Sequence, residues 1–102
     1  MVSKNCIYFK NEQQQIWFDY GKKDADRDCY IYENSKLISA AFFAFHYETL
    51  HLYEKYRFSK HIHWKCQKND DFSLKINNVI YYIDKNDTNQ IKLFNELLIK
   101  IF

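Results

Sequence analysis

The sequence predicts an α+β domain in which an antiparallel β-sheet of about six strands packs against two α-helices, in the order βββαβββα. Three observations lead to this prediction: short aromatic and β-branched segments in both halves of the chain, a long apolar segment between them, and an amphipathic segment at the C-terminus. Hydrophobic residues make up 47% of the 102 residues and aromatic residues 20%. Such a composition is typical of a folded core, so we expect residues 1–102 to form a single globular domain.

The first half of the chain contains three segments that predict strands. Asn5–Phe9 and Gln15–Tyr20 are rich in aromatic and β-branched residues, and a polar stretch separates them, which is typical of a hairpin. Cys29–Glu33 follows a charged loop and predicts a third strand.

The segment Leu37–Phe58 predicts a central helix. Its large residues recur at steps of three and four, which places them on one helical face: Ile38, Phe42, Phe45, Thr49, Leu52, Tyr53 and Tyr56. Asn34 and Ser35 stand just before it as candidate N-caps. The alternative is that Leu37–Phe45 is a buried strand, because periodicity does not separate the two structures over a short apolar run. The length of the segment and its three alanines favour the helix.

The second half predicts three further strands and a terminal helix. Phe58–Gln67 alternates, with Ile62, Trp64 and Cys66 on one side of the strand and the histidines on the other. Two short strands follow, Phe72–Ile76 and Val79–Ile83, joined by a turn at Asn77 and Asn78.

The terminal helix is predicted to begin after a capping box formed by Asp87 and Gln90, with Thr88 as a second cap candidate. Its apolar residues share one face: Ile91, Phe94, Leu97, Leu98 and Ile101.

Composition also predicts a location. The N-terminal residues contain no long apolar stretch of the kind found in secretory signals. The longest uninterrupted apolar run, Ala40–Phe45, is far shorter than the roughly 20 residues of a membrane-spanning helix, so no membrane association is expected. The three cysteines, Cys6, Cys29 and Cys66, are odd in number and widely spaced. Reduced, buried thiols and a cytoplasmic protein are therefore expected.

Positive charge is concentrated between residues 55 and 68, although the formal net charge of the chain is only +2. This segment holds two histidines, His61 and His63, no acidic residue and five cations: Lys55, Arg57, Lys60, Lys65 and Lys68. Aromatic residues are interleaved with them, a combination that suits contact with phosphates or with an acidic protein surface. The alternative is a solvated strand face whose lysines maintain solubility and protect a sheet edge.

Negative charge is concentrated in the loop that contains Asp24, Asp26 and Asp28. The spacing resembles the start of a calcium-binding loop, but Cys29 stands where glycine is required and Ser35 where glutamate is required. We interpret the loop as a solvated segment and a second candidate contact for a basic partner.

No metal or catalytic site is predicted. In His61-x-His63-x-x-Cys66 the two histidines share one face of a strand and the cysteine lies on the other, and no further ligand pair completes a zinc site. A cysteine–histidine pair is the remaining catalytic alternative, with four histidines in the chain, but no local motif marks a nucleophile.

The sequence therefore favours a protein that acts by binding and needs no cofactor. Our leading interpretation is a small bacterial immunity or inhibitor protein that neutralises a cognate toxin or effector protein by occlusion. The candidate partner-binding residues are Lys55, Arg57, Lys60, His61, His63, Lys65, Asp24, Asp26 and Asp28. The alternative is a nucleic-acid-binding or anti-defence protein of a phage or mobile element that uses the basic segment, and a small enzyme is the third hypothesis.

Overall fold

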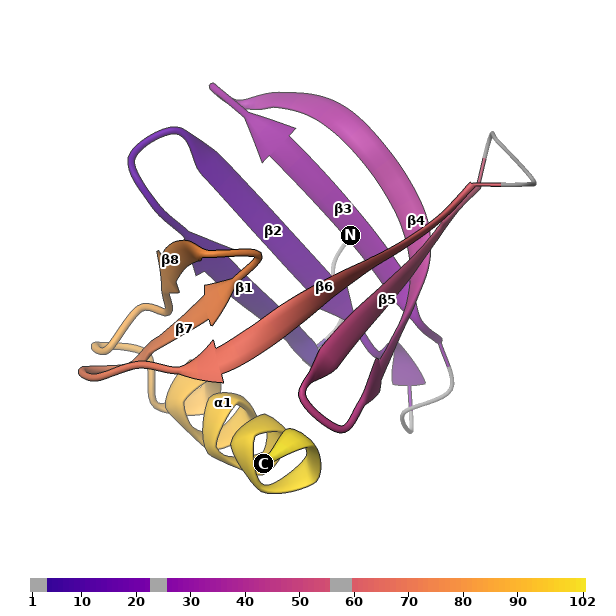
Figure 1. Cartoon of the computed structure of the whole chain (residues 1–102). Coiled ribbons are helices and arrows are strands. Elements are labelled where there is room, and N and C mark those ends of the chain that lie inside the picture. The colour runs from indigo at the N-terminus through magenta and orange to yellow at the C-terminus, as the bar shows by residue number, and fades with distance from the viewer. Residues whose placement is uncertain (1–3, 23–25, 56–59) are drawn as a thin grey trace.

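The structure, a computed structural model that describes residues 4–22, 26–55 and 60–102, is a closed antiparallel β-barrel followed by one C-terminal helix (Figure 1). Each strand pairs with the next one in the sequence, and β8 returns to pair with β1. The strands are β1 (Cys6–Lys10), β2 (Gln14–Asp19), β3 (Asp28–Glu33), β4 (Lys36–His46), β5 (Thr49–Glu54), β6 (His61–Lys68), β7 (Ser73–Ile76) and β8 (Val79–Tyr82). The helix α1 (Thr88–Ile101) lies across one end of the barrel (Figure 1).

The predicted α+β sheet with two helices is wrong, because the central helix does not form. Residues of the predicted helix instead form the longest strand, β4, and the next strand, β5. The buried residues of β4, such as Ala41 and Phe43, alternate with exposed ones, such as Phe42 and Ala44. This period of two is that of a strand. The steps of three and four arose because both faces of β4 carry large apolar residues, and the rival strand interpretation of Leu37–Phe45 is the correct one.

Tight turns join the strands that form in place of the predicted central helix. Tyr47 has a φ of 55°, so the backbone reverses between His46 and Thr49, which are paired across β4 and β5. The turn contains no Asn-Gly or Asp-Gly pair, the usual sequence signal of such hairpins. Asn34 and Ser35, predicted as N-caps, have φ values of 51° and 67° and form the turn between β3 and β4. The predicted turn at Asn77 and Asn78 is confirmed, with φ values of 53° and 64°.

The other predicted elements correspond to observed ones within a few residues. The helix begins at the predicted cap, where the Asp87 carboxylate accepts hydrogen bonds from the backbone N–H groups of Asn89 and Gln90. Phe94, Leu97 and Ile101 on its apolar face are buried against the barrel.

The core lies inside the barrel and changes in character along its axis. Near α1 the interior is filled by aromatic rings at centroid separations of 5.0–5.9 Å: Phe9, Phe18, Tyr20, Phe43, Phe45 and Phe94. Towards the opposite end the inward side chains of β2, β3 and β4 are smaller: Ile16, Ile31 and Ser39. Aromatic rings therefore fill the end near α1, whereas aliphatic and small side chains from β2–β4 line the other end.

The barrel closes through a short seam. Strands β1 and β8 share only one paired position, Lys10 with Tyr82. Further along β1 the side chain of Gln90 takes the place of a neighbouring strand: its Nε2 donates to the Cys6 carbonyl at 2.7 Å, and its Oε1 accepts from the Tyr8 N–H at 2.9 Å. Gln90 is only 4% exposed. The predicted capping box is thus half correct, because Asp87 caps the helix but the side chain of Gln90 binds β1 instead of reaching back to the cap.

Candidate binding face

The outer surface of strands β3–β6 carries three rows of side chains that run across the strands. The first row is Asp28, Phe42, Tyr53 and His61; the second is Ala44, His51 and His63; the third is His46, Thr49 and Lys65. Residues directly opposite in antiparallel strands have their Cβ atoms about 5 Å apart, so each row is a continuous line of neighbours. These ten residues, together with Lys55, are called the binding face below.

Two large aromatic side chains lie in the first row. Phe42 is 53% exposed and Tyr53 is 45% exposed, and they are directly opposite each other in the β4–β5 ladder. Tyr53 also stacks on the ring of His61, with centroids 4.3 Å apart and planes within 12°. A rigid sheet therefore holds these exposed rings in fixed positions.

The side chain of Lys55 closes the first row at its β3 end. Its Nζ lies 2.7 Å from an Asp28 carboxylate oxygen and 4.9 Å from the centroid of the Phe42 ring. Partial desolvation lowers the pKa of Lys55, but hydrogen bonding and charge from Asp28, with a smaller contribution from Tyr30, raise it on balance. Lys55 is therefore a fixed cation whose charge is largely matched by Asp28.

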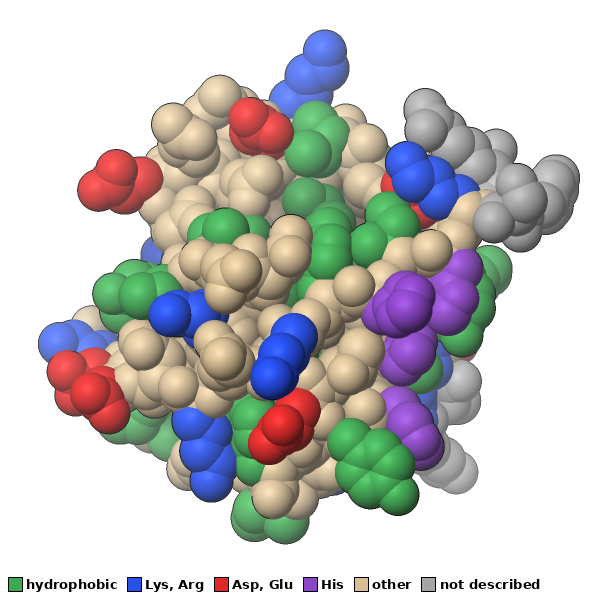
Figure 2. Space-filling model, in the orientation of Figure 1, with side chains coloured by type: hydrophobic (Ala, Val, Ile, Leu, Met, Phe, Trp, Pro, Cys, Tyr) green, Lys and Arg blue, Asp and Glu red, His purple; other side chains and the backbone are tan. Residues whose placement is uncertain are grey.

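Three histidines on β5 and β6 are stacked in one cluster. The rings of His51, His61 and His63 are 4.9–5.6 Å apart, with planes within 27° of one another. His51 Nδ1 and His61 Nε2 are 3.0 Å apart and share a hydrogen bond. Figure 2 shows the histidines gathered along one side of the molecule, over β5 and β6. Partial burial lowers the pKa of His51, and so do the neighbouring His61, His63 and His46, so the neutral form of this ring is favoured.

The structure brings together some of the residues predicted from sequence. Lys55 and Asp28, taken from the basic segment and the acidic loop as rival sites, form an ion pair on one face. His61, His63 and Lys65 are exposed on the same face, and Lys60 is exposed just before β6. Arg57 and Asp24 lie outside the described residues. Lys68 lies elsewhere, with its Nζ 5.4 Å from the Phe102 ring centroid near the end of α1.

Asp26 lies in the loop after β2, away from the first row. Its backbone N–H donates to the Tyr20 carbonyl at 2.9 Å, and its carboxyl lies against Gly21, where any Cβ would collide with it. Gly21 has a φ of 66°, which glycine adopts without strain. The acidic loop is therefore fixed to the barrel near α1 at this point.

Six residues of the binding face were missed by sequence reasoning: Phe42, Ala44, His46, Thr49, His51 and Tyr53. All six fell inside the predicted helix, which assigned Phe42, Thr49 and Tyr53 to a buried stripe. Had the segment been interpreted as a hairpin with a turn at residues 47–48, alternation would have placed all six on the outer side.

Among the described residues, the three cysteines are buried, whereas the four histidines lie on the outer surface of the barrel. Cys66 points into the barrel, whereas His61 and His63 are on its outer surface. Within the residues that the structure describes, no group of three or more His, Cys, Asp and Glu side chains is arranged to hold a metal ion. All three cysteines are free and buried, and desolvation raises the pKa of Cys6 and of Cys66 to about 12 and that of Cys29 even further.

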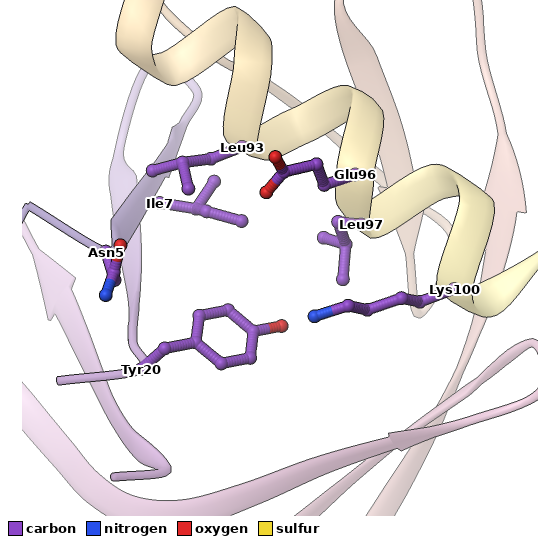
Figure 3. Close-up of a pocket in the computed structure, with 7 residues that line it drawn as sticks. All are labelled: Asn5, Ile7, Tyr20, Leu93, Glu96, Leu97 and Lys100. Atoms are coloured by element: carbon purple, nitrogen blue, oxygen red, sulfur yellow. The ribbon is translucent and has the colours of Figure 1, made fainter. Parts of the chain in front are cut away.

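A concave region of about 270 Å³ lies between α1 and the start of β1 (Figure 3). Ile7, Leu93 and Leu97 form its apolar wall, while the Tyr20 hydroxyl and the Lys100 amine point towards each other across it (Figure 3). Lys100 Nζ lies 5.3 Å from the Tyr20 ring centroid, and the guanidinium carbon of Arg27 lies 5.0 Å from the same centroid. These contacts fix the helix to the barrel, so we interpret this region as part of the packing contact between α1 and the barrel.

Comparison with known proteins adds no assignment. No family model matches the chain, and neither a curated protein nor a solved structure matches it significantly. Across residues 4–22, 26–55 and 60–102, no helix is both long and apolar enough to cross a membrane.

Proposed function

We propose that this chain binds a protein partner through the binding face and acts as an inhibitor or immunity protein that neutralises a toxin or effector by occlusion. The observation that carries the proposal is the pair of exposed, directly opposed rings of Phe42 and Tyr53 in a rigid sheet. Exposed aromatic side chains surrounded by polar groups are the usual anchors of protein interfaces. Because strands hold them in place, little conformational entropy is lost when a partner covers them.

The charges around the rings support a protein partner over a nucleic acid. Lys55 is paired with Asp28, and the lowered pKa of His51 favours its neutral ring, so both features limit the positive charge at the centre of the face. Lys60 and Lys65 remain as exposed cations beyond the aromatic pair. This pattern of an apolar centre and a polar rim is typical of protein interfaces, whereas affinity for nucleic acid comes mainly from cations that contact phosphates.

Occlusion requires a stable face that fits its partner in shape and charge, and the paired strands β3–β6 supply a stable face. The three buried, free thiols support action in a reducing compartment such as the cytoplasm.

The test is a protection assay with a double variant. The chain is co-expressed with the protein encoded beside it, and growth and binding are measured for wild type and for Phe42→Ala/Tyr53→Ala. Loss of one central anchor typically costs about 2 kcal/mol or more, which is about 30-fold in affinity, and such costs are not additive. The double variant should therefore weaken binding at least about 30-fold. Ile99→Ala is the matched control, because Ile99 is 81% exposed on α1 and lies outside the binding face.

Two results would contradict the proposal. One is equal protection by wild type and by the double variant, with the Ile99→Ala control unaffected. The other is binding of labelled single-stranded DNA that weakens steeply between about 50 and 200 mM salt, which would favour the nucleic-acid alternative. The thermal unfolding midpoint of each variant should be measured alongside, because exposed positions usually change stability by only about 0.5 kcal/mol.

A further inference from the structure

The barrel has a hollow in its open end. The cavity, of about 340 Å³, opens at the end opposite α1 and is lined by residues of β2 to β6 and of β8: Gln14, Ile16, Ile31, Ile38, Ser39, Leu52, Glu54, Ile62, Trp64 and Tyr81. It is called the cup below. In Figure 2 hydrophobic side chains are visible in the interior, between the upper ends of β2, β3 and β4 and the strand β6 (compare Figure 1).

The cup follows from the lengths of the strands and from the side chains inside them. Strands β7 and β8 have four residues each, whereas β4 has eleven, so the barrel wall is lower on one side. At the α1 end, aromatic rings fill the interior. At the open end β4 contributes Ser39 to the lining, and this side chain is too small to fill the space opposite it. An eight-stranded barrel is just wide enough to hold either its own side chains or one small ligand.

Most of the residues that line the cup are apolar. Ile16 and Leu52 are fully buried, Ile31 is buried, and Ile62 and Trp64 are partly covered beside them. A liquid water molecule takes up about 30 Å³, so the cup has room for a molecule of about ten non-hydrogen atoms. Binding sites for small molecules are usually concave, largely apolar and equipped with a few fixed polar groups.

Two residues of the cup, Tyr81 and Glu54, provide hydrogen-bond acceptors. The Tyr81 hydroxyl donates its proton to Gln14 Oε1 at 2.7 Å, which leaves the phenolic oxygen as an acceptor. Glu54, which also takes part in another interaction, adds a carboxylate, and an ionised carboxylate offers about four acceptor positions. Among the described residues that line the cup there is no lysine, arginine or histidine, so nothing there would pair with an anion.

We propose that the cup binds one small, largely apolar molecule that carries a hydrogen-bond donor such as a hydroxyl or a protonated amine. The ring or branched chain of the ligand lies against Ile31, Ile62 and Trp64, and its donor faces the oxygens of Tyr81 and Glu54. An anion of the same size is excluded, because burying a carboxylate beside Glu54 without a cation is costly. This site is independent of the binding face, since it uses the inner side chains of the strands whose outer side chains form that face.

Three probes that share a phenyl ring test the proposal: 2-phenylethylamine, 2-phenylethanol and phenylacetate. Each is titrated into the full chain at pH 7, and binding is followed by amide chemical shifts in two-dimensional NMR. The amine and the alcohol should shift the amides around Ile31, Ile62 and Trp64 in a saturable way. Phenylacetate should bind at least about tenfold more weakly than the amine, which corresponds to about 1.4 kcal/mol.

Three variants test whether the probes bind inside the cup. Ser39→Phe fills the cup and should reduce binding of the amine and the alcohol at least tenfold. Should this variant not fold, Ile62→Trp fills the same space from β6. Glu54→Gln should reduce the preference for the amine over phenylacetate and leave the binding of 2-phenylethanol within about twofold. The proposed function does not enter this test, because Phe42→Ala/Tyr53→Ala should bind all probes like wild type.

The proposal is overturned if no probe gives saturable shifts at millimolar concentration, if the shifts fall near α1 instead of the cup, or if the folded cup-filling variants bind like wild type. It is also overturned if phenylacetate binds as tightly as the amine.

Discussion

Gln90 offers the sharpest test of how the barrel is closed. Its side chain bridges α1 and β1 by donating to the Cys6 carbonyl and accepting from the Tyr8 N–H. In Gln90→Leu both partners on β1 lose their hydrogen bonds, while the volume of the side chain stays similar. Because β8 pairs with β1 only at Lys10, no strand stands ready to replace the lost bonds.

The expected cost can be worked out from the burial of these groups. A buried donor or acceptor left unsatisfied costs about 1–3 kcal/mol, so two of them cost about 2–6 kcal/mol. Leucine recovers part of this, because full burial of an apolar side chain is worth about 1.5–3 kcal/mol and the methylenes of Gln90 already supply some of that. The net loss in the free energy of unfolding should be about 1–4 kcal/mol.

Urea denaturation of wild type and Gln90→Leu measures this difference, and hydrogen exchange of the Tyr8 amide reports its location. The Tyr8 amide should exchange faster in the variant by a larger factor than amides in the β4–β5 ladder. Asn89→Ala is the matched control, because Asn89 donates to the Lys4 carbonyl at 3.0 Å at an exposed position one residue away. Equal unfolding free energies with unchanged protection of Tyr8 would show that Gln90 does not hold the seam together.

Three further predictions concern the core, the thiols and the histidines. Phe18→Ala should lower the free energy of unfolding by about 3–5 kcal/mol, because Phe18 is fully buried against three other rings. In the same denaturation assay, Phe42→Ala on the exposed side should lower it by less than about 1 kcal/mol. At pH 8 the native chain should react with a thiol reagent far more slowly than the denatured chain, in which all three cysteines react. The reason is that burial raises the pKa of Cys6 and Cys66 to about 12 and that of Cys29 still further, which leaves almost no thiolate. Fast modification of the native protein would refute their burial. By NMR titration, the pKa of His51 should lie below its ordinary value and should rise in His61→Gln. The folded state then binds fewer protons than the unfolded state. The contribution of His51 to stability is therefore present above the unfolded pKa of about 6.5 and is lost as the pH falls from there through the folded pKa. An unshifted titration of His51 would contradict the stacked cluster.

Most strands were predictable from sequence because they alternate in the ordinary way. In Ile62, Trp64 and Cys66, inward apolar residues alternate with the polar residues between them, and the structure preserves that order. The terminal helix was equally clear, because Asp87 marks its start and a single apolar stripe follows. In each case one face met the core and the other met water.

Strand β4 could not be recognised in this way, because its outer side is also partly apolar. Phe42 and Ala44 lie outside the barrel and Ala41 and Phe43 inside, so the sequence shows an unbroken apolar run that fits either period. The turn at Tyr47 gives no glycine signal. The binding face was accordingly predicted only from its charges, whereas its exposed rings became visible when the hairpin was known. The pairing of Lys55 with Asp28 depends on the register of three strands, which sequence patterns do not determine.

The order of the strands around the barrel also bears on how the chain folds. Seven of the eight ladders join strands that are adjacent in the sequence, so each can form as a local hairpin. Only the eighth, between Lys10 and Tyr82, has to close a loop of about 70 residues, which costs on the order of 4 kcal/mol of chain entropy. The row of hairpins should therefore assemble first, and docking of α1 through Gln90 should be the late step that converts an open, curling sheet into a barrel. By the same reasoning the β1–β8 seam should be the first part of the molecule to open under native conditions, well before the β3–β6 hairpins unfold.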